Sequence, residues 1–139
     1  MNKILAYLFL FFTLFSCNQN ANDPIKEQYI QDSIVLNENI KLAADFKKHT
    51  ELAETKIKER DFTGAVAEFT KVLDFPVEVK AKMNYYVHRA SAYYSLGTSY
   101  YKEACKDATL YLELVNIYSN WNAETTQTAK FVQSKTCGE

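Results

Sequence analysis

Apolar residues recur along most of this chain at spacings of three and four, with polar residues in the positions between them. This spacing places the apolar side chains on one face of a helix, so it predicts amphipathic α-helices rather than strands. Six helices are expected, with approximate ranges 23–37, 40–57, 63–73, 77–96, 101–118 and 122–137. Asn37 and Asn39 lie between the first two ranges and either end one helix or cap the next. The pattern predicts an all-α protein.

The composition agrees with helices joined by short connections. The chain of 139 residues contains only 3 Gly and 2 Pro, whereas an all-β fold needs many tight turns that are rich in these residues. This length accommodates a single domain. The formal net charge of -1 provides no strong field to attract nucleic acid or an anionic bilayer, so nucleic acid is not expected as a partner.

The first 16 residues have the layout of a secretory signal. Asn2 and Lys3 form a short positive start, and an apolar run follows over 4–15, interrupted only by Thr13. A membrane-spanning helix needs about 20 apolar residues, whereas the apolar region of a cleavable signal is shorter. Residues 1–16 are therefore expected to be a signal peptide.

The apolar run ends in Leu14-Phe15-Ser16-Cys17, which resembles the lipobox of bacterial lipoproteins. The resemblance implies that the leader is removed and that Cys17 carries diacylglycerol and a further fatty acid such as palmitate. Several acyl chains on one residue would hold the protein stably to a membrane. Phe15 departs from the family pattern, which has a smaller residue there. The alternatives are an ordinary signal with an incidental cysteine and an uncleaved anchor.

A short polar segment follows this cysteine. Residues 17–22 comprise Cys17 and a tether of five residues, which reaches at most about 17 Å. Asn18, in place of an aspartate, resembles the sorting state that sends many such lipoproteins to the outer membrane. The resemblance thus implies a lipid anchor at the cell outer membrane, with the body on either the periplasmic or the surface face.

Two segments of the mature chain share one pattern. Each has a small residue midway along one helix, and a small residue on the next helix is followed four and seven positions later by further inward side chains. The first copy has Ala53, Ala65, Phe69 and Val72, and the second has Ala90, Ala104, Ala108 and Tyr111. These segments resemble tetratricopeptide (TPR) repeats, in which two antiparallel helices form a unit of 34 residues. In the first copy, Lys56 and Arg60 replace the aromatic residue and the glycine of the family. The alternative is a generic helical bundle.

The resemblance implies a short TPR-like array with two degenerate repeats at 46–118, an N-terminal helical extension at 23–45 and a C-terminal capping helix at 119–139. Two repeats cannot bury a continuous core alone, so the flanking segments are expected to cover the open ends. The C-terminal helix should then turn a polar face outward, made of Thr125, Thr126, Gln127, Thr128 and Gln133.

Two cysteines, Cys105 and Cys137, remain after Cys17. If the last two helices form an antiparallel hairpin that turns near Trp121, both cysteines lie 16 residues from the turn and face one another. The envelope outside the inner membrane is oxidising, so a disulfide between them is predicted. The alternative is a pair of buried free thiols.

The sequence contains no recognisable catalytic or metal-binding constellation. His49 and His88 have no partner at a metal-ligand spacing, and no glycine-rich phosphate loop is present. Charged residues are scattered along the helices as on ordinary solvated faces. No enzyme activity, metal or cofactor is expected.

In the TPR family, the side of each first helix that faces away from the packing lines a concave groove for extended peptides. The resemblance carries this role over to Lys47, Thr50, Glu54, Ile57 and Lys58 in the first copy and to Asn84, Val87, Ser91, Tyr94 and Ser95 in the second. Tyr94 alternatively packs inside the array. The expected function is non-catalytic binding or scaffolding of another envelope protein or peptide. The second hypothesis is a permanent structural subunit of an outer-membrane biogenesis or secretion assembly.

Overall fold

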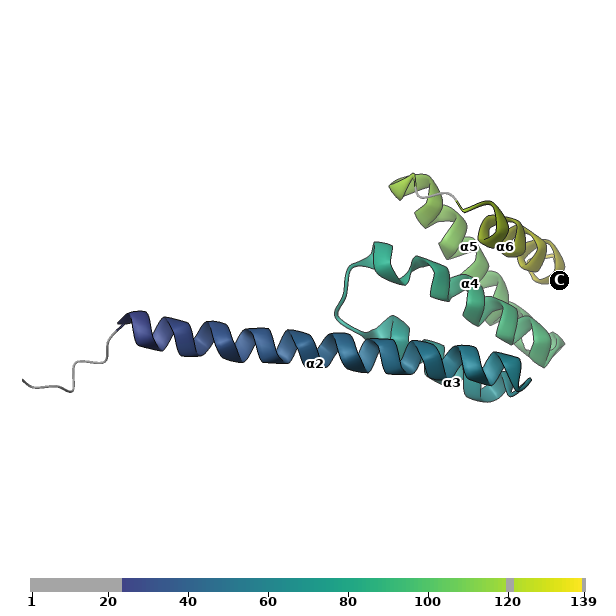
Figure 1. Cartoon of the computed structure of the whole chain (residues 1–139). Coiled ribbons are helices and arrows are strands. Elements are labelled where there is room, and N and C mark those ends of the chain that lie inside the picture. The colour runs from purple at the N-terminus through teal and green to yellow at the C-terminus, as the bar shows by residue number, and fades with distance from the viewer. Residues whose placement is uncertain (1–23, 120–121, 139) are drawn as a thin grey trace, which may run out of the picture. The chain divides into compact units, whose positions relative to one another are not determined.

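The computed structural model describes residues 24–119 and 122–138 (Figure 1). In these residues the elements follow in the order α2 (Pro24–Lys58), α3 (Phe62–Asp74), α4 (Val79–Leu96), the 3-10 helix η1 (Thr98–Tyr100), α5 (Tyr101–Tyr118) and α6 (Ala123–Thr136). No strand occurs in this described part, so the predicted all-α class is confirmed. Among the described helices, none has both the length and the apolarity that crossing a bilayer requires. The expected leader, Cys17 and the tether lie outside the described residues.

The chain divides into two units, residues 1–39 and 40–139. In the described part of the first unit, α2 exposes its large apolar side chains, and Leu36 is 60% exposed. The other exposed apolar residues between 29 and 35 are Tyr29, Ile30, Ile34 and Val35. This exposure gives no support to the predicted capping role of the segment, which stays a prediction.

Helix α2 continues through Asn37 and Asn39, which corrects the expectation that they end one helix or cap the next. Asparagine is only a moderately poor helix former and costs about 0.7 kcal/mol relative to alanine. Neither glycine nor proline occurs between Ile25 and Glu59, so no residue in this stretch forces a break. Both asparagines are exposed, so their side chains have access to water.

The second unit is an array of helical hairpins. Figure 1 shows α5 running antiparallel to α4, and α6 antiparallel to α5. The C-terminal part of α2 packs on α3, where His49 Nδ1 and Glu68 Oε2 lie 2.5 Å apart. The described helices of this unit therefore form the small TPR-like array that the sequence predicts.

Helix α4 is central to the core of the array. It contributes Ala92 to a cluster with α2 and α3, and it contributes Ala90, Met83 and Val87 to two clusters with α5 and α6. Alanines allow the helices to approach closely because their side chains are small, and those that the pattern singled out are fully buried: Ala53, Ala65, Ala90, Ala104 and Ala108. Each cluster joins three helices, so no hairpin forms a core alone.

Each of the two hairpin turns contains a residue with a positive φ, Arg60 in the first turn and Gly97 in the second. Arg60 adopts a left-handed φ of 61° after α2, and Asp61 N donates to the carbonyl oxygen of Lys56 at 2.9 Å. Gly97 adopts a φ of 99° after α4, and its N–H donates to the carbonyl oxygen of Tyr94 at 3.1 Å. Gly97 adopts its conformation without strain because it has no Cβ atom, whereas Arg60 holds its left-handed φ at some cost in strain.

A charged pair lies in the interior between α4 and α5. Arg89 donates from Nε to Asp107 Oδ2 at 2.7 Å and from Nη2 to Oδ1 at 2.9 Å, and its Nη1 reaches Thr70 Oγ1 of α3 at 3.1 Å. The side chains of Arg89 and Asp107 are only 17% and 4% exposed. A bidentate pair of this kind satisfies both charges and fixes the relative position of three helices. The sequence analysis did not anticipate it.

At the junction between α3 and α4, the second hairpin begins two residues later than expected. Helix α4 begins at Val79 rather than near Val77, with Glu78 at its N-cap. The ammonium group of Lys82 donates to the carbonyl oxygens of Leu73 at 2.8 Å and Phe75 at 2.9 Å. These bonds satisfy carbonyl groups at the end of α3, which have no partner within the helix.

A disulfide joins α5 to the residue that follows α6. Cys105 and Cys137 are bonded, with their Cα atoms 5.1 Å apart, which confirms the predicted pairing. Ala129 and Val132 of α6 are buried against α4 and α5. Helix α6 therefore covers the last hairpin, as expected for the C-terminal segment.

The polar face predicted for α6 needs one correction, because Thr126 is buried. The hydroxyl of Tyr111 from α5 lies 2.7 Å from Thr125 Oγ1 and 3.4 Å from Thr126 Oγ1. Thr126 therefore faces the core rather than solvent. Gln133 Nε2 also donates inward, to Thr109 Oγ1 of α5 at 2.9 Å. Thr125 and Thr126 therefore serve as partners for the buried Tyr111 hydroxyl rather than as solvated cover.

Candidate protein-binding groove

The predicted groove residues come from α2 and α4, and most of them reach the surface. Those that are exposed are Lys47, Glu54, Lys58, Asn84 and Ser95. Those that are half-buried are Thr50, Ile57, Ser91 and Tyr94. The Ser95 hydroxyl donates to the carbonyl oxygen of Ser91 in its own helix at 2.9 Å. The α2 line and the polar α4 positions are accessible to a partner.

Two of the predicted groove residues face other helices instead. Val87 is 1% exposed and packs with Tyr111 in the core, so it cannot contact a bound segment. The ring of Tyr94 stacks on Tyr101 at 5.6 Å and meets Phe131 edge-on at 5.7 Å. The physical reason is that α6 packs on α4 as well as on α5, which turns this side of α4 inward.

The accessible line on α4 consists of Asn84, His88, Ser91 and Ser95. The spacing of four, three and four residues keeps them on one face of the helix. The sequence analysis treated His88 as an isolated histidine, although this spacing places it among three of the predicted groove residues. His88 therefore joins the groove, and Val87 leaves it.

A small hollow lies between α2, α3 and α4 on this face. It has a volume of about 220 Å³ and is lined by Glu54, Ile57, Lys58, Phe69 and His88. The rings of Phe69 and His88 are stacked, with centroids 5.7 Å apart and planes 17° apart. The hollow thus joins predicted groove residues of α2 to the accessible line of α4.

His88 stacks on Phe69, lies beside Tyr85 and is exposed as a whole. Desolvation by its packed neighbours lowers its pKa below the ordinary 6.5, although the nearby carboxylates of Glu54 and Glu124 act in the opposite direction. The neutral form of the imidazole is therefore favoured. Glu124 belongs to the first turn of α6, so the surroundings of His88 include charges from the helices on both sides of α4.

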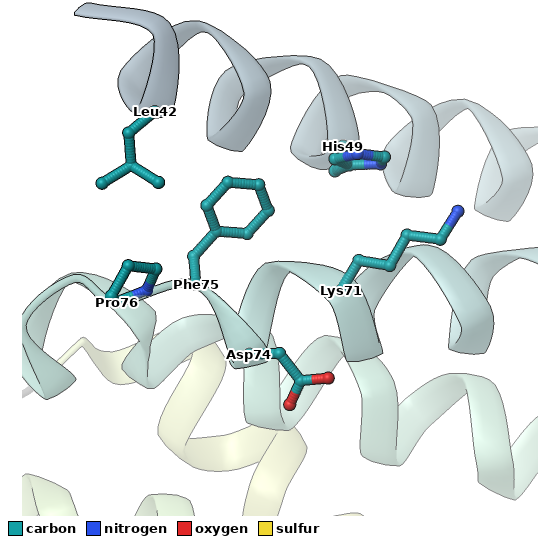
Figure 2. A pocket seen from close by; sticks show the side chains of 6 residues that line it. All are labelled: Leu42, His49, Lys71, Asp74, Phe75 and Pro76. Atoms are coloured by element: carbon teal, nitrogen blue, oxygen red, sulfur yellow. The ribbon is translucent and has the colours of Figure 1, made fainter. Parts of the chain in front are cut away.

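A second hollow, of about 390 Å³, lies between α2 and the end of α3 (Figure 2). Figure 2 shows Phe75 pointing toward α2 between Leu42 and His49, whereas Asp74 points away from α2. The ring of Phe75 also meets Phe46 edge-on, with centroids 5.6 Å apart. The lining is mainly apolar, so this hollow offers packing surface more than polar recognition.

The polar side of this hollow is a cluster around Glu68. Its Oε1 accepts a hydrogen bond from Lys71 Nζ at 2.6 Å, and its Oε2 lies 2.5 Å from His49 Nδ1. The bond from Lys71 is the main cause that holds the pKa of Glu68 below its usual 4.5, and His49 acts in the same direction. The cluster links α2 to α3, so it has a structural role.

The described residues offer little for catalysis. No group of three or more His, Cys, Asp or Glu side chains in 24–119 and 122–138 is placed to hold a metal ion. Within the same ranges, every buried side-chain nitrogen or oxygen has a hydrogen-bond partner. The groove offers polar side chains, apolar surface and charged groups to a partner.

No protein-family model, curated protein or solved structure matches this chain.

Proposed function

We propose that this chain is a lipid-anchored protein of the cell envelope that docks an extended segment of another protein without catalysing a reaction. The observation that supports this best is the accessible line of Asn84, His88, Ser91 and Ser95 on the central helix, with a hollow beside it. An extended segment needs a continuous face with alternating polar contacts and shallow pockets, and this face has both.

The proposed anchor is the set of acyl chains on Cys17. The lipobox-like Leu14-Phe15-Ser16-Cys17 supports lipidation, and Asn18 supports delivery to the outer membrane. Holding the groove beside a membrane raises its effective concentration toward partners there, so a modest intrinsic affinity is sufficient. The replacement Cys17→Ala should move the protein out of the membrane fraction and remove the acyl mass from its N-terminal peptide.

The docking proposal is tested by cross-linking in intact cells, followed by purification of the chain and identification of what it carries. Asn84→Arg and Ser95→Arg each place a large charged side chain on the groove face and should abolish capture. Both positions are exposed, so the fold should tolerate them. Ser99→Arg makes the same change at an exposed site in η1 and serves as the matched control. Capture that both groove variants leave intact would contradict the proposal.

A second candidate function, a permanent subunit of an envelope assembly, is favoured by the exposed apolar side chains of α2. Ile30, Val35 and Leu36 are each about half exposed or more, and an apolar surface of this kind marks an interface in many proteins. A permanent subunit should aggregate when made without its assembly. The triple variant with Gln at these three positions should then restore a monomer, as size-exclusion chromatography with light scattering would show.

A further inference from the structure

We infer that the hollow beside His88 receives an arginine side chain of the docked segment. This inference rests on the proposed docking function and specifies the chemistry of the partner. The hollow lies on the accessible face of α4, and its lining combines apolar groups, an imidazole and a carboxylate.

The floor of the hollow suits a flat group. The rings of Phe69 and His88 stack with only 17° between their planes, and Ile57 adds an aliphatic wall. A guanidinium group is planar and weakly hydrated, so it stacks on aromatic surfaces, whereas a lysine ammonium is compact and strongly hydrated. A neutral imidazole accepts such a cation without repulsion.

The charges at the rim favour a cation. Glu54 lines the hollow from α2, and the carboxylate of Glu124 from α6 is close enough to His88 to influence its titration. Both side chains are exposed and have no hydrogen-bonded cation among the contacts of the described residues. Carboxylates bind guanidinium through paired hydrogen bonds, which adds geometric specificity to the charge attraction.

Lys58 is the one lining residue with the opposite effect. Its ammonium group is exposed at the rim and repels an incoming cation, so it limits the affinity of the site. The charged residues around the hollow should therefore have opposite effects on arginine binding when they are replaced. Removal of Lys58 should strengthen binding, whereas removal of either carboxylate should weaken it.

The test uses the full chain in detergent, with histidine labelled by carbon-13, and N-acetyl-arginine amide as the probe. The chain has only two histidines. His49 pairs with Glu68 and does not line the hollow, so it acts as an internal control. The arginine probe should shift the resonances of His88 and leave those of His49 unchanged. N-acetyl-citrulline amide has the same shape without the charge and should bind roughly tenfold more weakly.

The variants sharpen the test. Glu54→Gln and Glu124→Gln should each weaken arginine binding by about threefold to tenfold, and Lys58→Gln should strengthen it by about threefold. A response of His88 that is equal for arginine and citrulline overturns the inference. So does a response that the double variant Glu54→Gln with Glu124→Gln leaves unchanged, or the absence of any response at His88.

Failure of the inference is distinguishable from failure of the docking function. If Ser95→Arg stops the capture of a partner in cells while the double glutamine variant captures it normally, the arginine site is wrong and the groove stands. If Asn84→Arg and Ser95→Arg both capture the partner normally, the docking function itself is wrong. Loss of capture in Ser95→Arg and in the double glutamine variant, together with the arginine response at His88, supports the inference and the docking function.

Discussion

Glu68 of α3 and Asp107 of α5 occupy equivalent places in the two hairpins, three residues after the buried alanines Ala65 and Ala104. Each carboxylate pairs with a basic side chain of an earlier helix, His49 of α2 in the first hairpin and Arg89 of α4 in the second. The distances along the chain between the paired residues are 19 and 18. The carboxylates therefore occupy equivalent places, but their basic partners do not. His49 lies four residues before Ala53, whereas Arg89 lies one residue before Ala90.

The two pairs differ in burial and in strength. Arg89 and Asp107 share two hydrogen bonds in the interior, whereas His49 and Glu68 are 23% and 15% exposed and meet through one contact. Arginine stays charged at any pH that the protein survives, but histidine is charged only when protonated. The second hairpin therefore has a bidentate pair that stays charged, whereas the pair of the first hairpin includes Glu68, whose pKa Lys71 and His49 lower.

The largest predicted effect breaks the interior pair. Asp107→Ala leaves the guanidinium of Arg89 buried without its partner and should lower the free energy of unfolding by about 3–5 kcal/mol. Urea unfolding followed by circular dichroism measures the loss. Lys106→Ala, a change at an exposed neighbour on the same helix, should have little effect. A loss for Asp107→Ala that is no greater than for Lys106→Ala would show that the pair is not a main support.

The next effect removes the covalent link between α5 of the second hairpin and the residue that follows α6; the first hairpin contains no cysteine. Replacing Cys105 and Cys137 together by serine should lower the free energy of unfolding by about 3–4 kcal/mol, because the disulfide closes a loop of 32 residues. Chemical denaturation measures this difference. A reductant should bring the native protein down to the stability of the double variant and should leave that variant itself unchanged.

The turn of the second hairpin gives an intermediate effect. Gly97→Ala should lower the free energy of unfolding by about 1–3 kcal/mol, because φ 99° with ψ -173° is strained for any residue with a Cβ atom. A Cβ at this position meets no atom within 4 Å, so the cost would come from the backbone alone. Gly138→Ala also meets no atom and is the control. Equal thermal unfolding of both variants would contradict the strain argument.

The edge pair of the first hairpin should contribute less. Glu68→Gln should lower the free energy of unfolding at pH 7 by roughly 1 kcal/mol, since the lost bonds to Lys71 and His49 are partly open to water. Because the pKa of Glu68 is held below 4.5, its contribution is complete above that pH and is lost as the pH falls below it. The gap between the native protein and the variant should therefore close in acid. Glu51→Gln, which affects an exposed pair with Lys47, is the control.

The smallest effect has the opposite sign. Arg60→Gly should raise the free energy of unfolding by about 0.5–1 kcal/mol, because glycine relieves the left-handed strain at the turn of the first hairpin. Arg60→Ala removes the charge but keeps the strain, so it should not stabilise the protein. Denaturant midpoints distinguish the two. Stabilisation by alanine as great as by glycine would point to the charge of Arg60 rather than to its backbone.

The sequence predicted those parts of the fold that local patterns govern. The later helices lie within two residues of their expected starts because Pro76, Gly97 and Asn122 mark turns and caps. The disulfide followed from equal distances along an antiparallel hairpin. The continuity of α2 was not predicted, because asparagine occurs at helix ends and is also tolerated inside helices. The presence of Asn37 and Asn39 alone does not show which of these roles they have.

The groove and the interior pair were harder to predict for a different reason. The orientation of α4 depends partly on α6, because Val87 is buried on the side where α6 packs and His88 is exposed. The pattern of apolar residues in α4 does not show that α6 packs on it in addition to α3 and α5. The pairing of Arg89 with Asp107 joins two helices through side-chain geometry. Neither feature leaves a local signal, so each requires the packed array.

The disulfide turns the last part of the chain into a covalent ring, since Cys105 is near the start of α5 and Cys137 follows α6. A protease that cuts once between these two residues severs the backbone but leaves both fragments attached. On a denaturing gel the nicked protein would keep its full mass until a thiol is added. The ring thus keeps α6 attached to α5 after a single cut of the backbone.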